Sequence, residues 1–188
     1  MDSFLREYIL LFHNHKRSLL TLGNLSLPGA KNMEEMIYDC YLESTAYNAS
    51  LSCELKLYDN KDIGENLYMG DNAIEYIYNV NEALEMWWSQ ILNIVDPVFN
   101  NSMNILNFSQ MAWAHTQYVG CAYQLCNNQT LFICHYNPRG NIVGMKIYEE
   151  GQSCQNNSDC EDVNAGFCNS ITGLCRGDLL MLNYSIIN

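Results

Sequence analysis

Basic residues, prolines and long apolar runs are all scarce in this 188-residue chain. Nine Lys and Arg stand against 21 Asp and Glu, so the formal net charge is −12. Phosphate backbones and anionic lipid surfaces repel such a chain, and no run of Lys or Arg forms a local basic patch. The sequence therefore predicts no nucleic-acid partner, and the lack of a long apolar run predicts no transmembrane segment.

Short catalytic and metal-binding motifs are missing as well. The sequence contains no Gly-x-Ser-x-Gly elbow, no His-Glu-x-x-His pair and no combination of Cys and His that suggests a nucleophile. It also lacks the tight Cys-x-x-Cys pairs that are typical of metal sites. We therefore expect a protein that is not an enzyme and that uses no cofactor.

What the chain has in abundance is cysteine and N-glycosylation sequons. Nine cysteines at long, irregular spacings favour disulfide bonds in an oxidising compartment over metal ligation. Seven Asn-x-Ser/Thr sequons support the same compartment and predict a glycoprotein. They begin at Asn24, Asn48, Asn100, Asn107, Asn128, Asn156 and Asn183. The chain opens on a helical pattern, so we expect a secreted, extracellular protein whose targeting segment has been removed.

Hydrophobic periodicity predicts helices first and strands later. The first helix should run from Ser3 to about Gly23, and its near-helical apolar residues are Phe4, Tyr8, Leu11, Phe12 and Leu19. Two further helices are expected from about 32 to 53 and from about 71 to 95, with irregular segments at 54–70 and 96–107. A short helical piece at 108–114 should precede strands at 118–124, 131–136 and 144–148. This order is typical of an α+β fold.

Several motifs then follow one another in a specific order. Residues 13–17 contain His-Asn-x-x-Arg, residues 64–66 read GEN, residues 108–113 read FSQMAW before VGCA at 119–122, and residues 132–141 read FICHYNPRGN. Together they resemble the CAP superfamily of cysteine-rich secretory, antigen 5 and pathogenesis-related proteins. The segment 32–43 and the tail up to Cys175 are similar to the secreted venom-allergen-like, Ancylostoma-secreted-protein-type proteins of parasitic nematodes.

The resemblance implies a three-layer α-β-α sandwich at 1–150, a disulfide-bonded cysteine-rich hinge at 151–176 and a C-terminal tail at 177–188. It implies the pairs Cys53–Cys126, Cys121–Cys134, Cys154–Cys168 and Cys160–Cys175. Cys40 is left over, and three explanations stay open: a lost upstream partner, a buried free thiol or an intermolecular bridge. Disulfides must hold the polar hinge, because it cannot fold by burial alone.

Most CAP domains have a cleft tetrad of two His and two Glu that can hold zinc. The resemblance places Leu57, Glu65, Gln90 and Asn107 at these positions. Leu offers no lone pair, amide oxygens are weak zinc donors, and a lone Glu65 cannot hold a first-row metal. We therefore predict a degenerate cleft without metal, in which Glu65 hydrogen-bonds backbone amides or Gln90 and supports the fold. A glycan on Asn107 would stand at the cleft rim, although the adjacent helix start could prevent glycosylation.

Other conspicuous side chains have ordinary structural explanations. The histidines are expected to be polar or packed residues rather than ligands, and they are His13, His15, His115 and His135. The three tryptophans, Trp87, Trp88 and Trp113, are expected to anchor the core.

The predicted function is that of a non-enzymatic parasite effector, which engages an extracellular host protein and modulates immunity. Its loops at 54–62 and 96–107 are candidate contact surfaces, and its acidic surface favours a basic partner. The alternative is an extracellular sterol or fatty-acid carrier. An apolar lip for that role would comprise Val95, Val98, Phe99 and Met103, unless these residues simply cover the core.

Overall fold

The computed structural model describes residues 1–25, 27–57, 61–71, 76–94, 96–101, 104–160 and 166–177. Its helices are α1 (Ser3–Thr21), α2 (Cys40–Ser50), α3 (Tyr76–Ser89) and α4 (Leu106–Met111), with short 3-10 turns η1 (Gln90–Asn93) and η2 (Asn157–Cys160). Its strands are β1 (Ile37–Tyr38), β2 (Gly64–Asp71), β3 (Tyr118–Cys126), β4 (Gln129–Asn137), β5 (Phe167–Asn169) and β6 (Leu174–Arg176). Within the described ranges, none of the helices combines the length and the apolar character that crossing a membrane needs.

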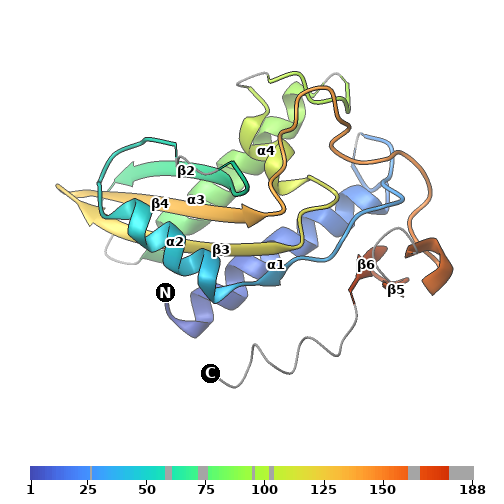
Figure 1. The fold of residues 1–188 in the computed structure, drawn as a ribbon, viewed down its shortest axis with the longest axis horizontal. Coiled ribbons are helices and arrows are strands. Elements are labelled where there is room, and N and C mark those ends of the chain that lie inside the picture. Colours follow the sequence, from blue (N-terminus) through green and yellow to red (C-terminus); the bar gives the residue numbers. More distant parts are fainter. Residues whose placement is uncertain are drawn as a thin grey trace.

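A four-stranded sheet in the order β1-β3-β4-β2 forms the middle layer. Asn127 and Asn128 join β3 to β4 with φ angles of 47° and 68°, as a two-residue type I′ hairpin turn requires. β2 pairs antiparallel with β4, and β1 pairs parallel with β3. α2 packs on one face of this sheet, while α1, α3 and α4 form the layer on the other (Figure 1). The three-layer α-β-α sandwich is the expected architecture.

Two of the predicted strand assignments need correction. Residues 64–70 are not irregular but belong to β2, whose buried positions are Gly64, Asn66, Tyr68 and Gly70. Two glycines and an asparagine on the buried side give no hydrophobic alternation, so the pattern hid the strand. Residues 144–148 do not form a strand of their own. They contribute one isolated bridge, between Val98 and Lys146.

The second helix also begins later than its periodicity predicts. It starts at Cys40, where the Asp39 side chain accepts a hydrogen bond from the Leu42 amide at 2.6 Å and so acts as the N-cap. The preceding residues contain β1 rather than a helical turn. Asn32, the expected cap, instead accepts a hydrogen bond from the Glu149 amide at 2.8 Å.

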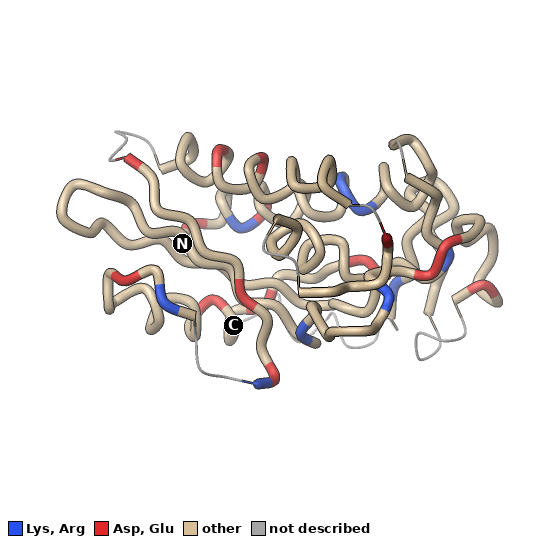
Figure 2. Tube along the Cα trace, turned by 90° about the horizontal axis from the view of Figure 1, so that it is seen from above, with Lys and Arg blue, Asp and Glu red and all other residues tan. Residues whose placement is uncertain are grey.

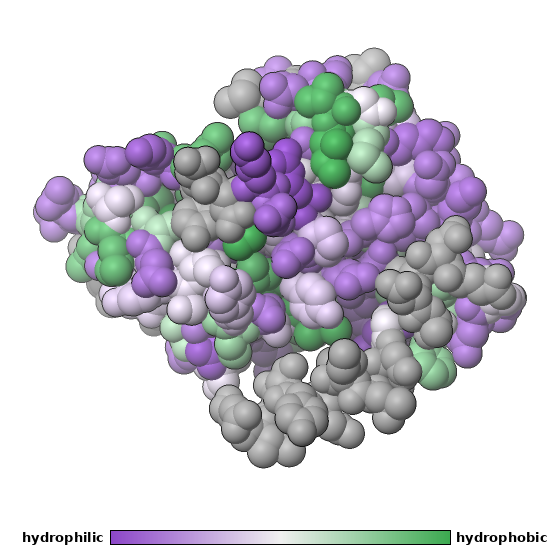
Figure 3. All heavy atoms as spheres, in the orientation of Figure 1, coloured by the Kyte–Doolittle hydropathy of each residue, from purple (hydrophilic) through white to green (hydrophobic). Residues whose placement is uncertain are grey.

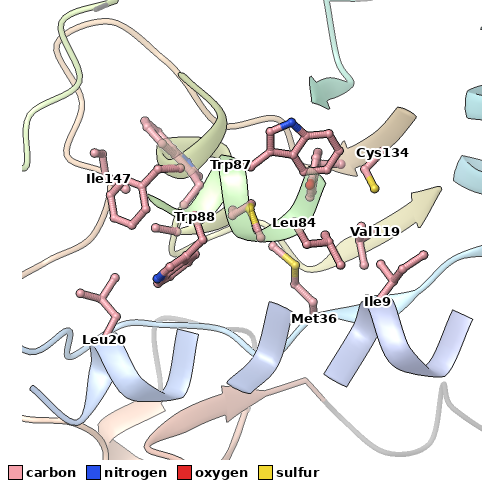
Figure 4. Close-up of a cluster of buried hydrophobic side chains, with 14 of the residues drawn as sticks. Ile9, Leu20, Met36, Leu84, Trp87, Trp88, Val119, Cys134 and Ile147 are labelled. Atoms are coloured by element: carbon pink, nitrogen blue, oxygen red, sulfur yellow. The ribbon is translucent and has the colours of Figure 1, made fainter. Parts of the chain in front are cut away.

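The core lies between the sheet and the layer of α1 and α3. Figure 4 shows Ile9 and Leu20 of α1 pointing toward residues of α3 and of the sheet, such as Leu84 and Val119. All three tryptophans are buried there, as predicted. Trp87 stacks on Phe132 of β4 with ring centroids 5.5 Å apart, which ties α3 to the sheet.

The buried stripe of α1 differs from the apolar set found in the sequence. It consists of Leu5, Ile9, His13, Arg17, Leu20 and Thr21. Phe4 and Leu11, two members of the predicted set, are exposed instead. The helix is therefore rotated so that a histidine and an arginine face the core while large apolar side chains face solvent.

Four disulfide bonds hold the chain, and they are the pairs expected from the resemblance: Cys53–Cys126, Cys121–Cys134, Cys154–Cys168 and Cys160–Cys175. The small β5–β6 sheet of the hinge rests on the segment before β1. The Cys175 amide donates to the Met33 carbonyl at 2.8 Å, and the Glu35 amide donates to the Cys175 carbonyl at 2.7 Å.

Candidate functional site

A cleft of about 600 Å³ opens where β2 begins, beside α4; Figure 1 shows these two elements next to each other. Three of the four predicted tetrad positions line it, namely Leu57, Glu65 and Asn107. The other lining residues are Ile63, Gly64, Leu67, Asn101, Leu106, Gln110, Arg139, Gly140 and Asn141. The fold thus brings together residues that lie far apart in the sequence.

Glu65 is held by a histidine that the sequence did not indicate as its partner. The His135 Nε2 lies 2.9 Å from the Glu65 carboxylate, and both side chains are buried. On the other side of the ring, His135 Nδ1 lies 2.8 Å from the Thr45 hydroxyl of α2. The prediction named backbone amides or Gln90 as partners of Glu65. The signal that could have found His135 is its position in β4, directly opposite Glu65 of β2 in the strand register.

Gln90 stands behind the cleft wall rather than in it. Its Oε1 accepts hydrogen bonds from the backbone amides of Asn107 at 2.9 Å and Phe108 at 3.2 Å. These are among the first amides of α4, which have no partner inside the helix. Because Ile105 provides no side-chain cap, Gln90 takes over the capping of α4 and fixes the helix that carries Asn107.

Two glycines of the family motifs allow the cleft floor to form. The Gln110 Oε1 accepts a hydrogen bond from the Gly140 amide at 2.9 Å. A Cβ on Gly64 would lie only 2.1 Å from the same oxygen, and one on Gly140 would collide with the Trp113 side chain. Glycine at both positions lets β2, α4 and the loop after β4 approach one another.

The exposed lining residues of the cleft are Leu57, Asn101 and Arg139, one apolar, one polar and one cationic. Leu57 is 73% exposed, so it presents an aliphatic side chain where relatives are expected to place an imidazole. Arg139 is exposed as well, and its Nη1 donates to the Lys61 carbonyl at 3.0 Å. One carboxylate deep in the cleft and one guanidinium at its rim leave the charge of the cleft balanced.

A buried polar network links α1 to the cleft through His13. The His13 Nδ1–H donates to the Ile9 carbonyl at 2.7 Å, and the Tyr136 hydroxyl donates to Nε2 at 3.0 Å. Asn66 of β2 then donates to the Tyr136 oxygen at 3.3 Å and to the Asn107 carbonyl at 3.1 Å. Burial lowers the pKa of His13 to about 4 and raises that of Tyr136, so both groups are neutral at pH 7.

Arg17 is the second buried polar anchor of α1. Its guanidinium donates to backbone carbonyls only, at distances of 2.6–3.3 Å. These carbonyls belong to Glu34, Met111, Trp113, Ala114 and Thr116. Burial lowers the pKa of Arg17 to about 9, which still leaves it charged at neutral pH. Arg17 therefore fixes the turn after α4 and the segment before β1 against α1.

A second cavity, of about 440 Å³, lies by the start of α2 and contains Cys40. Cys40 is free and exposed, which rules out the expectation of a buried thiol. The neighbouring lining residues are Met1, Glu43, Ser44, Tyr47, Ala122 and Tyr123. Glu43 is itself engaged by Arg6 through two hydrogen bonds of 2.7 and 2.8 Å. The lining contains no histidine that could serve as a base for Cys40.

The predicted sequons lie in different surroundings. Five of the asparagines are exposed, namely Asn24, Asn48, Asn100, Asn128 and Asn156. Asn107 is half-buried, and the Ser109 of its sequon is buried with a 2.6 Å hydrogen bond to Asn141. Asn183 lies outside the described residues.

Of the predicted apolar lip, Phe99 is not available as a surface. Phe99 is a core residue, and its ring packs edge-on against Trp113 with centroids 6.3 Å apart. Val98 is half-buried, while Val95 and Met103 lie outside the described residues. For Phe99, covering of the core is therefore the correct explanation.

Within the described part of the chain, one group of three potential metal ligands has its ligand atoms within 4.8 Å of one another: Cys154, Cys160 and Cys168. All three sulfurs are consumed by the hinge disulfides. A separate pair is formed by the exposed His115 and the buried Glu34, whose side chains lie 3.0 Å apart. His13 and His135 are buried and hydrogen-bonded within the fold.

Known proteins share this sequence and this architecture. The family model for the cysteine-rich secretory protein family, CAP, matches residues 10–136. The Ancylostoma secreted protein of Ancylostoma caninum is 30% identical, over 93% of this chain, although the chain spans only 45% of that protein. Hookworm platelet inhibitor 1 of the same organism is 31% identical, over 88% of this chain and 78% of the relative.

Solved structures agree. BmVAL-1 has a TM-score of 0.84 and 32% identity, over 95% of this chain and 97% of its own. NaASP2, crystallised with Zn²⁺, has a TM-score of 0.82 and 28% identity, over 93% of this chain and 96% of its own. With the signature motifs, the α-β-α layers and the hinge in their family places, this chain belongs to the cysteine-rich secretory protein (CAP) family.

Proposed function

We propose that this chain is a secreted, non-enzymatic binding protein that engages an extracellular host protein and modulates host immunity. Its CAP cleft has, in this proposal, lost the ability to hold a metal and serves as a structural element. The observation that carries the proposal is that the polar side chains of two tetrad positions, Glu65 and Gln90, are already committed to the fold, while a third position is Leu57.

The donor atoms at the tetrad positions do not suit a first-row metal. Leu57 has no donor, the Gln90 oxygen caps α4, and the Glu65 carboxylate binds His135. Zinc sites in proteins are built mainly from Cys, His and carboxylate ligands, with three or four of them from the protein. Zn²⁺ is present in the NaASP2 crystal structure, whereas in our proposal the cleft of this chain binds none.

Catalysis finds no support in the same cleft. General acid–base chemistry needs a titratable group that can reach a substrate. The Glu65 and His135 side chains are both buried and bind each other, and the other ring nitrogen of His135 meets Thr45. Binding, by contrast, needs a rigid scaffold with a variable surface, which the sandwich and its disulfides provide. A relative is named a platelet inhibitor, which makes host blood cells a reasonable place to look for a partner.

The test is saturable binding to host cells. Fluorescently labelled, glycosylated protein should bind washed platelets or leukocytes with a measurable Kd, and excess unlabelled protein should compete. Because no metal takes part, EDTA should leave the Kd unchanged, and a calorimetric titration with zinc should give no stoichiometric uptake. If the labelled protein bound saturably to neither platelets nor leukocytes, an extracellular host protein on these cells would be refuted as the partner. One zinc ion per chain in the cleft would refute the degenerate site.

The sterol or fatty-acid carrier is the weaker candidate. Its lip depended on Phe99, which is buried against Trp113. Replacement of Phe99 would therefore perturb the core and could not separate lipid uptake from unfolding.

A further inference from the structure

The outer surface of the α1 and α3 layer has an unusual composition. Phe4 and Leu11 of α1 are 65% and 60% exposed, and Tyr78 of α3 is 68% exposed. Glu7 of α1 and Glu82 and Glu85 of α3 are exposed around them. We call these six residues the α1/α3 face. Scattered single apolar residues are normal on protein surfaces, but here they share one surface of two neighbouring helices.

A ring contact and a hydrogen bond connect the face across both helices. The Phe4 and Tyr8 rings stack with centroids 6.5 Å apart, and the Tyr8 hydroxyl donates to Asn81 of α3. Asn81 lies one helical turn from Tyr78, so their side chains are neighbours. Leu11 lies two turns from Phe4 on the same side of α1. The three apolar residues therefore belong to one continuous surface.

The charge of the α1/α3 face is one-sided. α3 contains no Lys or Arg, and each cation of α1 is engaged within the protein. Arg6 binds Glu43, Lys16 binds Glu85 at 3.0 Å, and Arg17 is buried. Glu7 and Glu82 are not matched by a cation of these two helices. Figure 2 shows that Lys and Arg are few and dispersed along the chain, so the acidic character is not cancelled by a neighbouring basic patch.

The sequon asparagines lie outside the two helices that form this surface. None of the seven begins within α1 or α3, whereas Asn48 is exposed on α2, on the opposite side of the sheet. That opposite side is the one in front in Figure 3, where the surface is mostly hydrophilic and hydrophobic residues gather only in small groups. A glycan on Asn48 would therefore stand on the face opposite the two helices, whereas Asn24 follows the end of α1, where its amide donates to the Leu19 carbonyl at 3.0 Å.

We propose that the α1/α3 face is the surface on which the host protein docks, and that the partner presents a basic surface with an apolar centre. The inference rests on the proposed function and names the face and the chemistry of its partner. Aromatic and aliphatic side chains at the centre of an interface carry most of the binding energy, while surrounding charges guide association. Tyr78 and Leu11 would supply the centre, and Glu7 and Glu82 the guiding charges.

The experiment compares two matched pairs of surface substitutions in the full glycosylated chain, with platelets and leukocytes as the probe. Leu11→Ser/Tyr78→Ser removes apolar groups from the α1/α3 face. Tyr41→Ser/Leu51→Ser removes the same residue types from the α2 side, where they are 71% and 55% exposed. We expect the first pair to raise the Kd about tenfold or more and the second to change it less than about twofold.

Charge is tested in the same way. Glu7→Lys should weaken binding to fixed cells, and Glu54→Lys, at an exposed position after α2, should not. Binding of the unaltered protein should weaken as salt rises from about 50 to about 300 mM, because screening acts on exposed charges. Thermal melts of every variant confirm that it is folded.

The outcomes separate this inference from the proposed function. If the unaltered protein binds no cells, the proposed function fails. If it binds but both pairs of substitutions leave the Kd unchanged, or both raise it equally, the α1/α3 face is not the docking surface. The inference is also wrong if only the α2 pair, or only Leu55→Ser/Leu57→Ser on the loop before β2, weakens binding to the cells. The interface would then lie at those residues.

Discussion

His13 couples the stability of the fold to pH. Its folded-state pKa of about 4 lies below the ordinary value of 6.5 because the ring is buried. Between these values the unfolded chain binds a proton that the folded chain excludes. The free energy of unfolding should therefore be highest above about pH 6.5 and fall as the pH drops toward 4, by roughly 3 kcal/mol from this residue alone.

Urea denaturation at a series of pH values measures this loss. His13→Gln should lower the free energy of unfolding at pH 7. It should also remove the His13 contribution to the decrease of that free energy between pH 6.5 and 4. His15→Gln, at an exposed position two residues away, should retain that contribution. A His13→Gln slope identical to that of the unaltered protein would contradict the assignment.

Individual site residues were predictable where a family motif defines them, but their partners were not. The positions of Glu65, Leu57 and Asn107 follow from the motifs, and all three line the cleft. The His135–Glu65 pair depends on strand register, and the Gln90 cap depends on how α3 meets α4. Both are long-range contacts for which the local sequence has no signal. Likewise, hydrophobic periodicity could not reveal that His13 and Arg17, which are polar, belong to the buried stripe of α1.

Among the elements, α2 and β3 approach most closely at Gly120. A Cβ there would lie 2.3 Å from the Glu43 amide nitrogen and 2.4 Å from the Asp39 carbonyl oxygen. Both atoms belong to the backbone at the start of α2, so no flexible side chain can move aside. Gly120→Ala should therefore push α2 away from the sheet and cost at least about 2 kcal/mol.

The matched control for this substitution is Gly177→Ala, because a Cβ at Gly177 meets nothing within 4 Å. Differential scanning calorimetry of both variants should show a lower Tm for Gly120→Ala only. Equal Tm values would mean that α2 is not held against β3 at this contact.

The boundaries of elements were less predictable than their existence. α1, α3 and the two strands of the β3–β4 hairpin follow from periodicity. The structure shows that Asn127 and Asn128, which tolerate left-handed φ angles, form the turn between these strands. The start of α2 was wrong because Asp39, not Asn32, provides the cap. β2 was missed because its buried side carries Gly64, Asn66 and Gly70.

At the scale of the whole molecule, we propose that the sandwich at 1–150 and the hinge at 151–176 unfold as distinct units. The Cys53–Cys126 bond closes 73 residues of the sandwich, whereas Cys154–Cys168 closes 14 residues of the hinge. In the chain-entropy model, loss of the longer loop removes about 4 kcal/mol of stability. All three tryptophans lie in the sandwich core, so their fluorescence reports on that unit.

Cys53→Ala/Cys126→Ala should therefore lower the urea midpoint of tryptophan fluorescence strongly. Cys154→Ala/Cys168→Ala should leave that midpoint nearly unchanged while making the hinge more sensitive to proteolysis. The two units are joined by the hydrogen bonds between Cys175 and the segment at 33–35. Equal drops in midpoint for both variants would mean that hinge and sandwich fold as one cooperative body.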